Sequence, residues 1–239
     1  MYFNIKNMEE KIFKACNIIN ENTKGTDIYD NVYIKGGCLR NLLLNKETFN
    51  DIDVAVYNGD NYIKFSKMLC DNFKCRSIYN PFIEKSNGSS VFTLFSLPDF
   101  SDIRFDVKAF VGETIIDDCN KKMDFTCNAL YLKTTTDLII DATGKGFNDI
   151  ENHILRMVHD NIFNESPIRI IRMLRFQQQL NFEIDSKTYE KAIESLDLLQ
   201  KVNPEWINQE CVKINPIFNL KELTELYSDI RMKYYKKDK

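Results

Sequence analysis

Two aspartates separated by one residue are the side chains of this chain best placed to do chemistry. Asp51 and Asp53 belong to the run DIDVAV, whose β-branched residues predict a strand over Ile52–Val56. Because successive side chains of a strand point to opposite faces, the two carboxylates share one face. Carboxylate oxygens are ligands that Mg²⁺ prefers, so the pair predicts a metal site. The alternative is a solvated strand end.

A pair of glycines upstream could supply the phosphate-binding half of such a site. Gly36 and Gly37 follow the predicted strand Val32–Ile34 and precede the helical apolar spacing of Cys38–Leu44. Where a Cβ is missing at this turn, a phosphate can approach backbone N–H groups and the positive end of the helix. A lone Gly-Gly is usually only a turn. Together with the aspartates it indicates metal-assisted phosphoryl transfer.

Composition narrows the class of protein. The chain has 239 residues, of which 44% are hydrophobic and 28% charged, as in a globular protein of one or two domains. We expect a cytoplasmic protein without membrane contact, because no apolar run reaches spanning length and the N-terminus lacks a signal-peptide core. Seven scattered cysteines and two histidines favour reduced thiols over a zinc site. The net charge of −3 still allows a local RNA-contacting stripe.

The stretch GGCLRNLLLNKETFNDID, residues 36–53, resembles the signature of the DNA polymerase β-like nucleotidyltransferases. It is most similar to class II tRNA nucleotidyltransferases, the CCA-adding enzymes, and bacterial poly(A) polymerases. Arg40 matches a helical arginine of that signature, whereas Asn41 stands where the family usually has aspartate. Further segments resemble other family motifs in the same order: Lys121–Leu132, Leu138–Val158, Glu165–Asp185 and Pro204–Ile214.

The resemblance implies an α+β fold. Residues 1–157 are expected to form the nucleotidyltransferase head, a mixed sheet with flanking helices. Residues 158–239 are expected to form a small all-helical neck that recognises the nucleotide. Family members usually continue with helical body and tail domains that grip RNA. We therefore expect RNA to be held by a small interface, an oligomer or a partner subunit.

The resemblance also implies a third carboxylate. It maps to Asp106, at the centre of the predicted strand Ile103–Phe110. Asp51, Asp53 and Asp106 are then the expected catalytic and metal-binding residues, holding two Mg²⁺ ions that neutralise the triphosphate. The alternative is an exposed or salt-bridged Asp106 on an edge strand.

A second set of residues is expected around the nucleotide. Gly36, Gly37 and Arg40 are expected to hold phosphate, and the RRDFTxNA-like segment adds polar residues near the ribose and phosphates. Met123 replaces an arginine of that motif, and Ser166 replaces an aspartate that reads the incoming base together with the arginine matching Arg169. The remaining members of the expected nucleotide-binding set are Lys122, Asp124, Asn128, Ser166, Arg169 and Arg172.

The start of the neck helix can be predicted, whereas the roles of two of its arginines stay open. Ser166 fits an N-cap and Pro167 the first helical position, so the helix is expected to begin here. Arg172 and Arg175 suit neck structure or RNA phosphate contacts as well as nucleotide binding.

The function implied is template-independent addition of CMP and AMP, from CTP and ATP, to an RNA 3′ end, namely tRNA CCA addition or repair. Ser166 and Met123 keep open a poly(A) polymerase or another specificity. A non-catalytic RNA- or nucleotide-binding relative is the remaining alternative. Retention of three candidate carboxylates argues against it, because buried acids without a compensating partner are costly.

Overall fold

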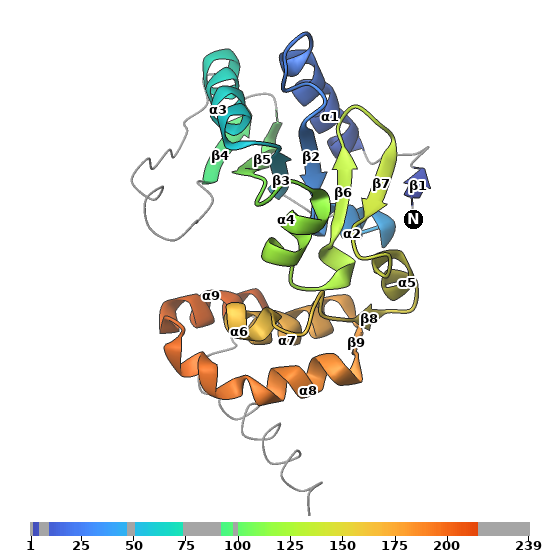
Figure 1. Ribbon diagram of the computed structural model, residues 1–239, viewed down its shortest axis with the longest axis vertical. Helices are drawn as coiled ribbons and strands as arrows, with labels where there is room; N and C mark the ends of the chain where they lie inside the picture. The colour runs from blue at the N-terminus through green and yellow to red at the C-terminus, as the bar shows by residue number, and fades with distance from the viewer. Residues whose placement is uncertain (1, 5–9, 47–50, 74–91, 98–99, 215–239) are drawn as a thin grey trace, which may run out of the picture. The chain divides into compact units, whose positions relative to one another are not determined.

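The computed structural model describes residues 2–4, 10–46, 51–73, 92–97 and 100–214 (Figure 1). Its internal contacts divide the chain into two units, Met1–Ile150 and Glu151–Lys239. The boundary thus precedes the position between residues 157 and 158 that the sequence predicted. Within the described residues, no helix combines the length and the apolar character needed to cross a bilayer.

A seven-stranded sheet organises the first unit, with the order β1-β7-β6-β2-β3-β5-β4. Strands β3 and β5 run parallel, and the other neighbours run antiparallel. This mixed sheet with flanking helices confirms the predicted α+β head. The strands are β1 (Tyr2–Asn4), β2 (Val32–Lys35), β3 (Asp51–Val56), β4 (Phe92–Leu97), β5 (Phe100–Ala109), β6 (Leu130–Lys133) and β7 (Leu138–Asp141).

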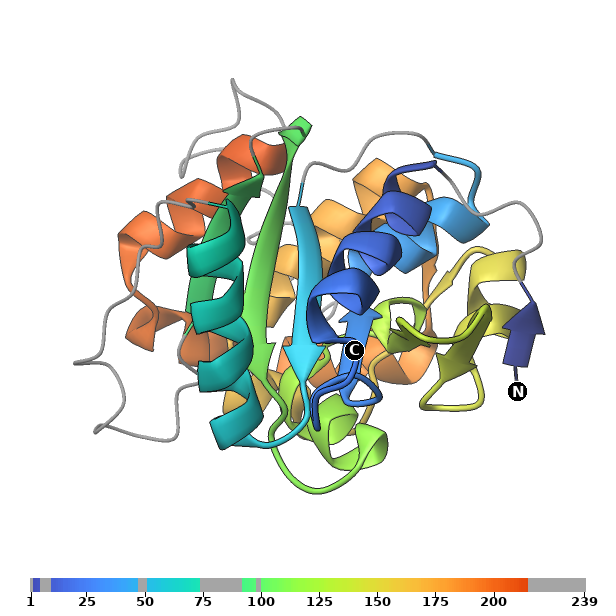
Figure 2. The ribbon, with the colours of Figure 1, turned by 90° about the horizontal axis from the view of Figure 1, so that it is seen from above.

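Helices connect these strands and cover the sheet. Figure 2 shows α1 and α3 lying side by side along one face of the central strands. Fully buried apolar residues such as Ile34, Val54 and Phe105 form the core of the central strands. The helices are α1 (Glu10–Thr23), α2 (Gly37–Leu43), α3 (Gly59–Phe73), α4 (Ile115–Lys122), the short 3₁₀ turn η2 (Thr126–Asn128) and α5 (Gly146–Glu151).

The second unit is mainly helical, but its short strand β9 (Glu183–Ile184) departs from the all-helical neck that the sequence predicted. Helix α7 buries Ile170, Met173 and Phe176, and it packs against α9. A two-stranded parallel sheet joins β8 to β9. The elements are β8 (Ile154–Leu155), α6 (Ile162–Glu165), α7 (Ile168–Leu180), β9 (Glu183–Ile184), α8 (Ser186–Glu194), η3 (Leu196–Lys201) and α9 (Pro204–Ile214).

The start of the neck helix differs from the sequence-based expectation. Ser166 ends α6 in an extended conformation, and Pro167 is the N-cap of α7 without a side-chain cap. Proline disfavours the helical region for the residue before it, and this explains the extended Ser166. The backbone N–H of Ser166 instead donates to Ile162 O at 3.1 Å, which closes α6. The predicted N-cap at Ser166 is therefore wrong.

Candidate active site

The central strands bring two of the predicted carboxylates together. Asp53 of β3 is the register partner of Asp106 of β5, and on its other side it is the partner of Lys35 of β2. Register partners on neighbouring strands present their side chains to the same face, so the three residues form a row across the sheet. Asp51 lies two residues before Asp53 on the same face, exposed at the first residue of β3. Strand β5 is an inner strand, which excludes the edge-strand alternative for Asp106.

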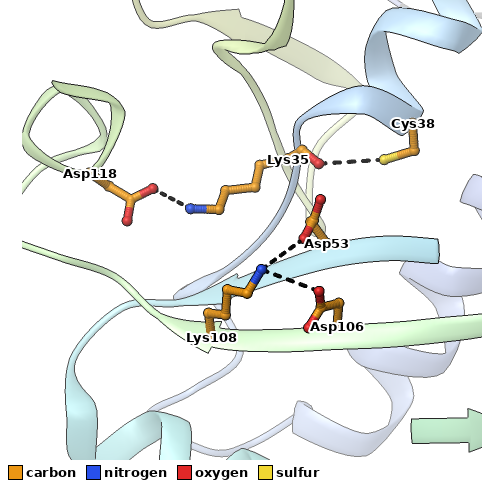
Figure 3. A network of polar contacts seen from close by, with 6 residues as sticks. All are labelled: Lys35, Cys38, Asp53, Asp106, Lys108 and Asp118. Carbon is orange, nitrogen blue, oxygen red and sulfur yellow. Dashed lines mark hydrogen bonds and ion pairs between the residues drawn. The ribbon is translucent and has the colours of Figure 1, made fainter. Parts of the chain in front are cut away.

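A lysine that sequence reasoning missed lies between the two paired carboxylates. Lys108 Nζ is 3.2 Å from Asp53 Oδ1 and 3.2 Å from Asp106 Oδ2 (Figure 3). Burial alone would lower the pKa of Lys108, but the charges of Asp53 and Asp106 outweigh it, and the net shift is upward. The signal in the sequence was the spacing of Asp106 and Lys108 at alternate positions of one strand.

Asp106 shows how the row could accept a metal ion. Burial raises the pKa of its carboxyl to about 6, and Lys108 opposes that shift. Within the described part of the chain, Asp106 Oδ1 is buried and has no hydrogen-bond partner. A buried carboxylate oxygen without a partner is costly, and a hard cation would satisfy it. The donor set therefore fits Mg²⁺.

The carboxylates are not arranged as a ready-made metal cage. Among the residues that the structure describes, no group of three or more histidine, cysteine or acidic side chains is gathered closely enough to hold a metal ion. Asp53 and Asp106 instead share the ammonium of Lys108. Asp106 is therefore salt-bridged in this structure, as the alternative interpretation of the sequence expected.

The glycine turn lies directly beside this row. Gly36 has φ 83° and ψ −141°, and α2 begins at Gly37. A Cβ at Gly36 would lie 3.4 Å from Asp53 Oδ2, so the bare backbone approaches the carboxylate closely. Its N–H donates to Leu130 O at 3.0 Å, which joins the turn to β6. The positive φ and this close approach explain why glycine occupies the position.

Three of the expected nucleotide-binding residues form a buried network. Arg40 Nη1 donates to Asn128 Oδ1 at 2.5 Å, and Asn128 Nδ2 donates to Asp124 Oδ1 at 2.8 Å. Arg40 Nε also donates to Asn41 Oδ1 at 3.1 Å, so the residue that replaces the usual aspartate still accepts from the guanidinium. The network ties α2 to the segment before β6. Lys122, by contrast, is exposed at the last residue of α4.

A buried ion pair that the sequence did not reveal supports the same region. Lys35 Nζ is paired with Asp118 Oδ2, which also accepts from the Tyr131 hydroxyl at 2.8 Å. Asp118 Oδ1 accepts from the backbone N–H of Val111 at 3.0 Å. These contacts join β2, β6, α4 and the turn after β5. Figure 3 shows the Lys35 side chain directed to Asp118, whereas the ammonium of Lys108 contacts Asp53 and Asp106.

In the second unit, the predicted arginines contact neighbouring helices. Arg169 Nη1 donates to Ile162 O at 3.3 Å and is buried. Arg172 Nη1 is 3.9 Å and Arg175 Nε is 3.2 Å from the carboxylate of Glu210 on α9. These pairs are what the neck-structure alternative expects. The roles of Ser166, Arg169 and Arg172 toward a nucleotide stay predictions.

Comparison with known proteins decides the family. Residues 32–156 match the family described as the Poly A polymerase head domain, which is more than half of the chain. The chain belongs to this family. The Poly A polymerase head match begins at the first residue of β2 and includes the glycine turn, the carboxylate row and the Arg40–Asn128–Asp124 network. Ser166 and Arg169 lie beyond it.

Two similar proteins are CCA-adding enzymes. A CCA-adding enzyme of Lactobacillus johnsonii is 28% identical over 215 residues, which cover 88% of this chain and 52% of that enzyme. One of Streptococcus gordonii is 32% identical over 187 residues, covering 76% and 45%. The chain thus spans about half the length of the curated relatives it matches.

Solved structures agree with this head-domain fold. The Thermotoga maritima CCA-adding enzyme complexed with tRNA-CCA superposes with a TM-score of 0.78 at 22% identity, over 97% of this chain and 55% of that one. A complex of a CCA-adding enzyme with CTP gives 0.76 at 23% identity, over 95% and 53%. At these identities the likeness shows the fold.

Proposed function

We propose that this chain transfers nucleotides from CTP and ATP to the 3′ hydroxyl of an RNA in the cytoplasm, without a template, and that its reaction is tRNA CCA addition or repair. One observation carries the proposal. Parallel register places Asp53 and Asp106 side by side, next to the Gly36 turn, in a chain of the Poly A polymerase head family.

The chemistry follows from the residues in this row. Asp53 and Asp106, joined by Asp51 on the same face, would hold Mg²⁺, which when bound neutralises the triphosphate and favours loss of the hydroxyl proton. The bare backbone lies against Asp53 at Gly36 and against the guanidinium of Arg40 at Gly37, and a phosphate would bind at this turn. The buried contacts of Arg40 with Asn128 hold the glycine turn in place for the nucleotide.

Solved structures of similar proteins support these substrates. CCA-adding enzymes have been solved with CTP, with ATP and with tRNA. For this chain, we propose CTP and ATP as nucleotide substrates and a tRNA 3′ end as acceptor.

A second candidate is nucleotide addition with another specificity, such as poly(A) synthesis. Two observations favour it. Ser166 offers a hydroxyl where the resemblance expects a carboxylate, and Met123 is buried where it expects an arginine. A hydroxyl can donate or accept, so it discriminates less strictly between bases than an acceptor-only carboxylate.

The test is incorporation of each radiolabelled nucleoside triphosphate with Mg²⁺. The acceptors are tRNAs ending before CCA, after the first C, after CC and after the complete CCA, beside an unrelated RNA. We expect addition of C and then A that stops, and its loss in the Asp53→Asn and Asp106→Asn variants. A long homopolymeric A product on every RNA would favour the second candidate. No incorporation on any acceptor would contradict both.

A further inference from the structure

The ammonium of Lys108 is built into the carboxylate row. Its Nζ is 3.2 Å from an oxygen of Asp53 and 3.2 Å from an oxygen of Asp106, and its side chain is 32% exposed. Lys108 follows Asp106 by two residues on β5, so strand alternation places both side chains on one face. The position of the cation is therefore set by the sheet.

The neighbouring lysine on this face, Lys35, does not contact the two carboxylates. Lys35 is the register partner of Asp53, yet its ammonium pairs with the buried carboxylate of Asp118. Lys108 therefore screens Asp53 and Asp106 from each other, and like charges in register positions would otherwise repel.

We propose that Lys108 is an internal counter-cation that competes with a divalent metal ion for Asp53 and Asp106, and so sets the metal affinity of the site. The inference rests on the proposed function, because it takes these two carboxylates as metal ligands. A metal ion that binds both must displace the ammonium from at least one oxygen. The energy of the broken ion pair then weakens metal binding.

The first test is Mn²⁺ binding to the full chain, followed by the electron paramagnetic resonance of free Mn²⁺. Lys108→Met keeps most of the side-chain length and removes the charge, and we expect it to bind Mn²⁺ about tenfold more tightly or better. Lys108→Arg keeps the charge and should bind close to wild type. Equal or weaker binding by Lys108→Met would overturn the proposal.

Lys133→Met is the matched control. Lys133 Nζ is 3.0 Å from Asp30 Oδ1, and its side chain is 29% exposed, close to that of Lys108. Its carboxylate partner lies outside the row, so Mn²⁺ affinity should not change. A gain equal to that of Lys108→Met would mean that overall charge, and not the contact with Asp53 and Asp106, sets the affinity.

A second measurement uses the wild-type chain and does not depend on whether Lys108→Met folds. An amine-acylating reagent is applied with and without saturating Mg²⁺, and modification of Lys108 is read by mass spectrometry. We expect Mg²⁺ to raise the labelling of Lys108 several-fold, because displacement frees the ammonium, and to leave Lys133 unchanged. Labelling of Lys108 that does not rise with Mg²⁺ would contradict the competition.

These results separate this inference from the proposed function. If Asp53→Asn abolishes Mn²⁺ binding while Lys108→Met leaves it unchanged, the metal site stands and only the role of Lys108 fails. If neither the wild type nor Lys108→Met binds Mn²⁺, the metal site and the competition are both rejected. Mn²⁺ binding that appears only in Lys108→Met would support the competition in its strongest form.

Discussion

At the scale of single residues, the charges around Asp106 set how the carboxylate row responds to acid. Burial raises the pKa of the Asp106 carboxyl to about 6, because the charged form loses water. Lys108 stabilises the carboxylate and limits the rise, whereas the charge of Asp53 adds to it. A proton therefore occupies Asp106 at a mildly acidic pH where an ordinary aspartate is still ionised.

This shift gives metal binding a characteristic pH dependence. A proton and a metal ion compete for the same carboxylate, so Mn²⁺ affinity of the wild type should fall as the pH drops through about 6. An aspartate with an ordinary pKa near ~3.9 would keep its affinity down to about pH 5. Mn²⁺ titrations at constant ionic strength check this, with circular dichroism to verify folding. Affinity that is constant from neutral pH to about pH 5 would contradict the prediction.

At the scale of elements, one buried ion pair holds the turn after β5 against β2 and β6. Asp118 is fully buried and accepts from Lys35, Tyr131 and the backbone of Val111. Removing one partner of a buried pair leaves the other charge uncompensated. Asp118→Asn should therefore lower the free energy of unfolding by about 3–5 kcal/mol, measured by urea denaturation.

Two further variants make that prediction specific. The double variant Lys35→Met/Asp118→Leu leaves no buried charge unpaired. Because apolar replacement of both partners of a buried pair is often neutral, this variant should recover part of the free energy of unfolding that Asp118→Asn loses. Asp30→Asn removes the exposed partner of Lys133 and should leave the denaturation midpoint unchanged. If Asp118→Asn is as stable as Asp30→Asn, the buried pair does not stabilise the unit.

Local patterns were enough to predict the elements around the glycine turn. The β-branched runs and the helical spacing between them correspond to β2, α2 and β3, because these signals depend on near neighbours in the chain. The contacts of Lys108 with Asp53 and of Lys35 with Asp118 could not be predicted in this way. They depend on the register of distant strands and on where α4 packs, which no local spacing encodes. At Ser166 the sequence held two adjacent signals, a serine suited to an N-cap and a proline that disfavours the helical region for the residue before it. The effect of the proline decided the structure, because Ser166 is extended and Pro167 is the N-cap of α7.

At the scale of the whole molecule, the two units carry different parts of the proposed reaction. The carboxylate row belongs to the unit Met1–Ile150, and the residues expected to select the base belong to Glu151–Lys239. Changes in the second unit should therefore alter which nucleotide is added without altering metal binding by the first. Ser166 is the natural position for this test, because it departs from the resembled motif.

Ser166→Asp should sharpen the preference for CTP and ATP. A carboxylate accepts hydrogen bonds from the amino groups of cytosine and adenine, and it repels the carbonyl oxygens that uracil and guanine present at the same edge. We expect the ratio of kcat/KM for CTP over UTP to rise about tenfold, because a good base contact is worth ~1–3 kcal/mol.

Ser186→Asp, at the exposed start of α8 in the same unit, is the control and should not change this ratio. Mn²⁺ affinity should be equal in both variants, and a Ser166→Asp chain with unchanged nucleotide preference would show that this position does not select the base.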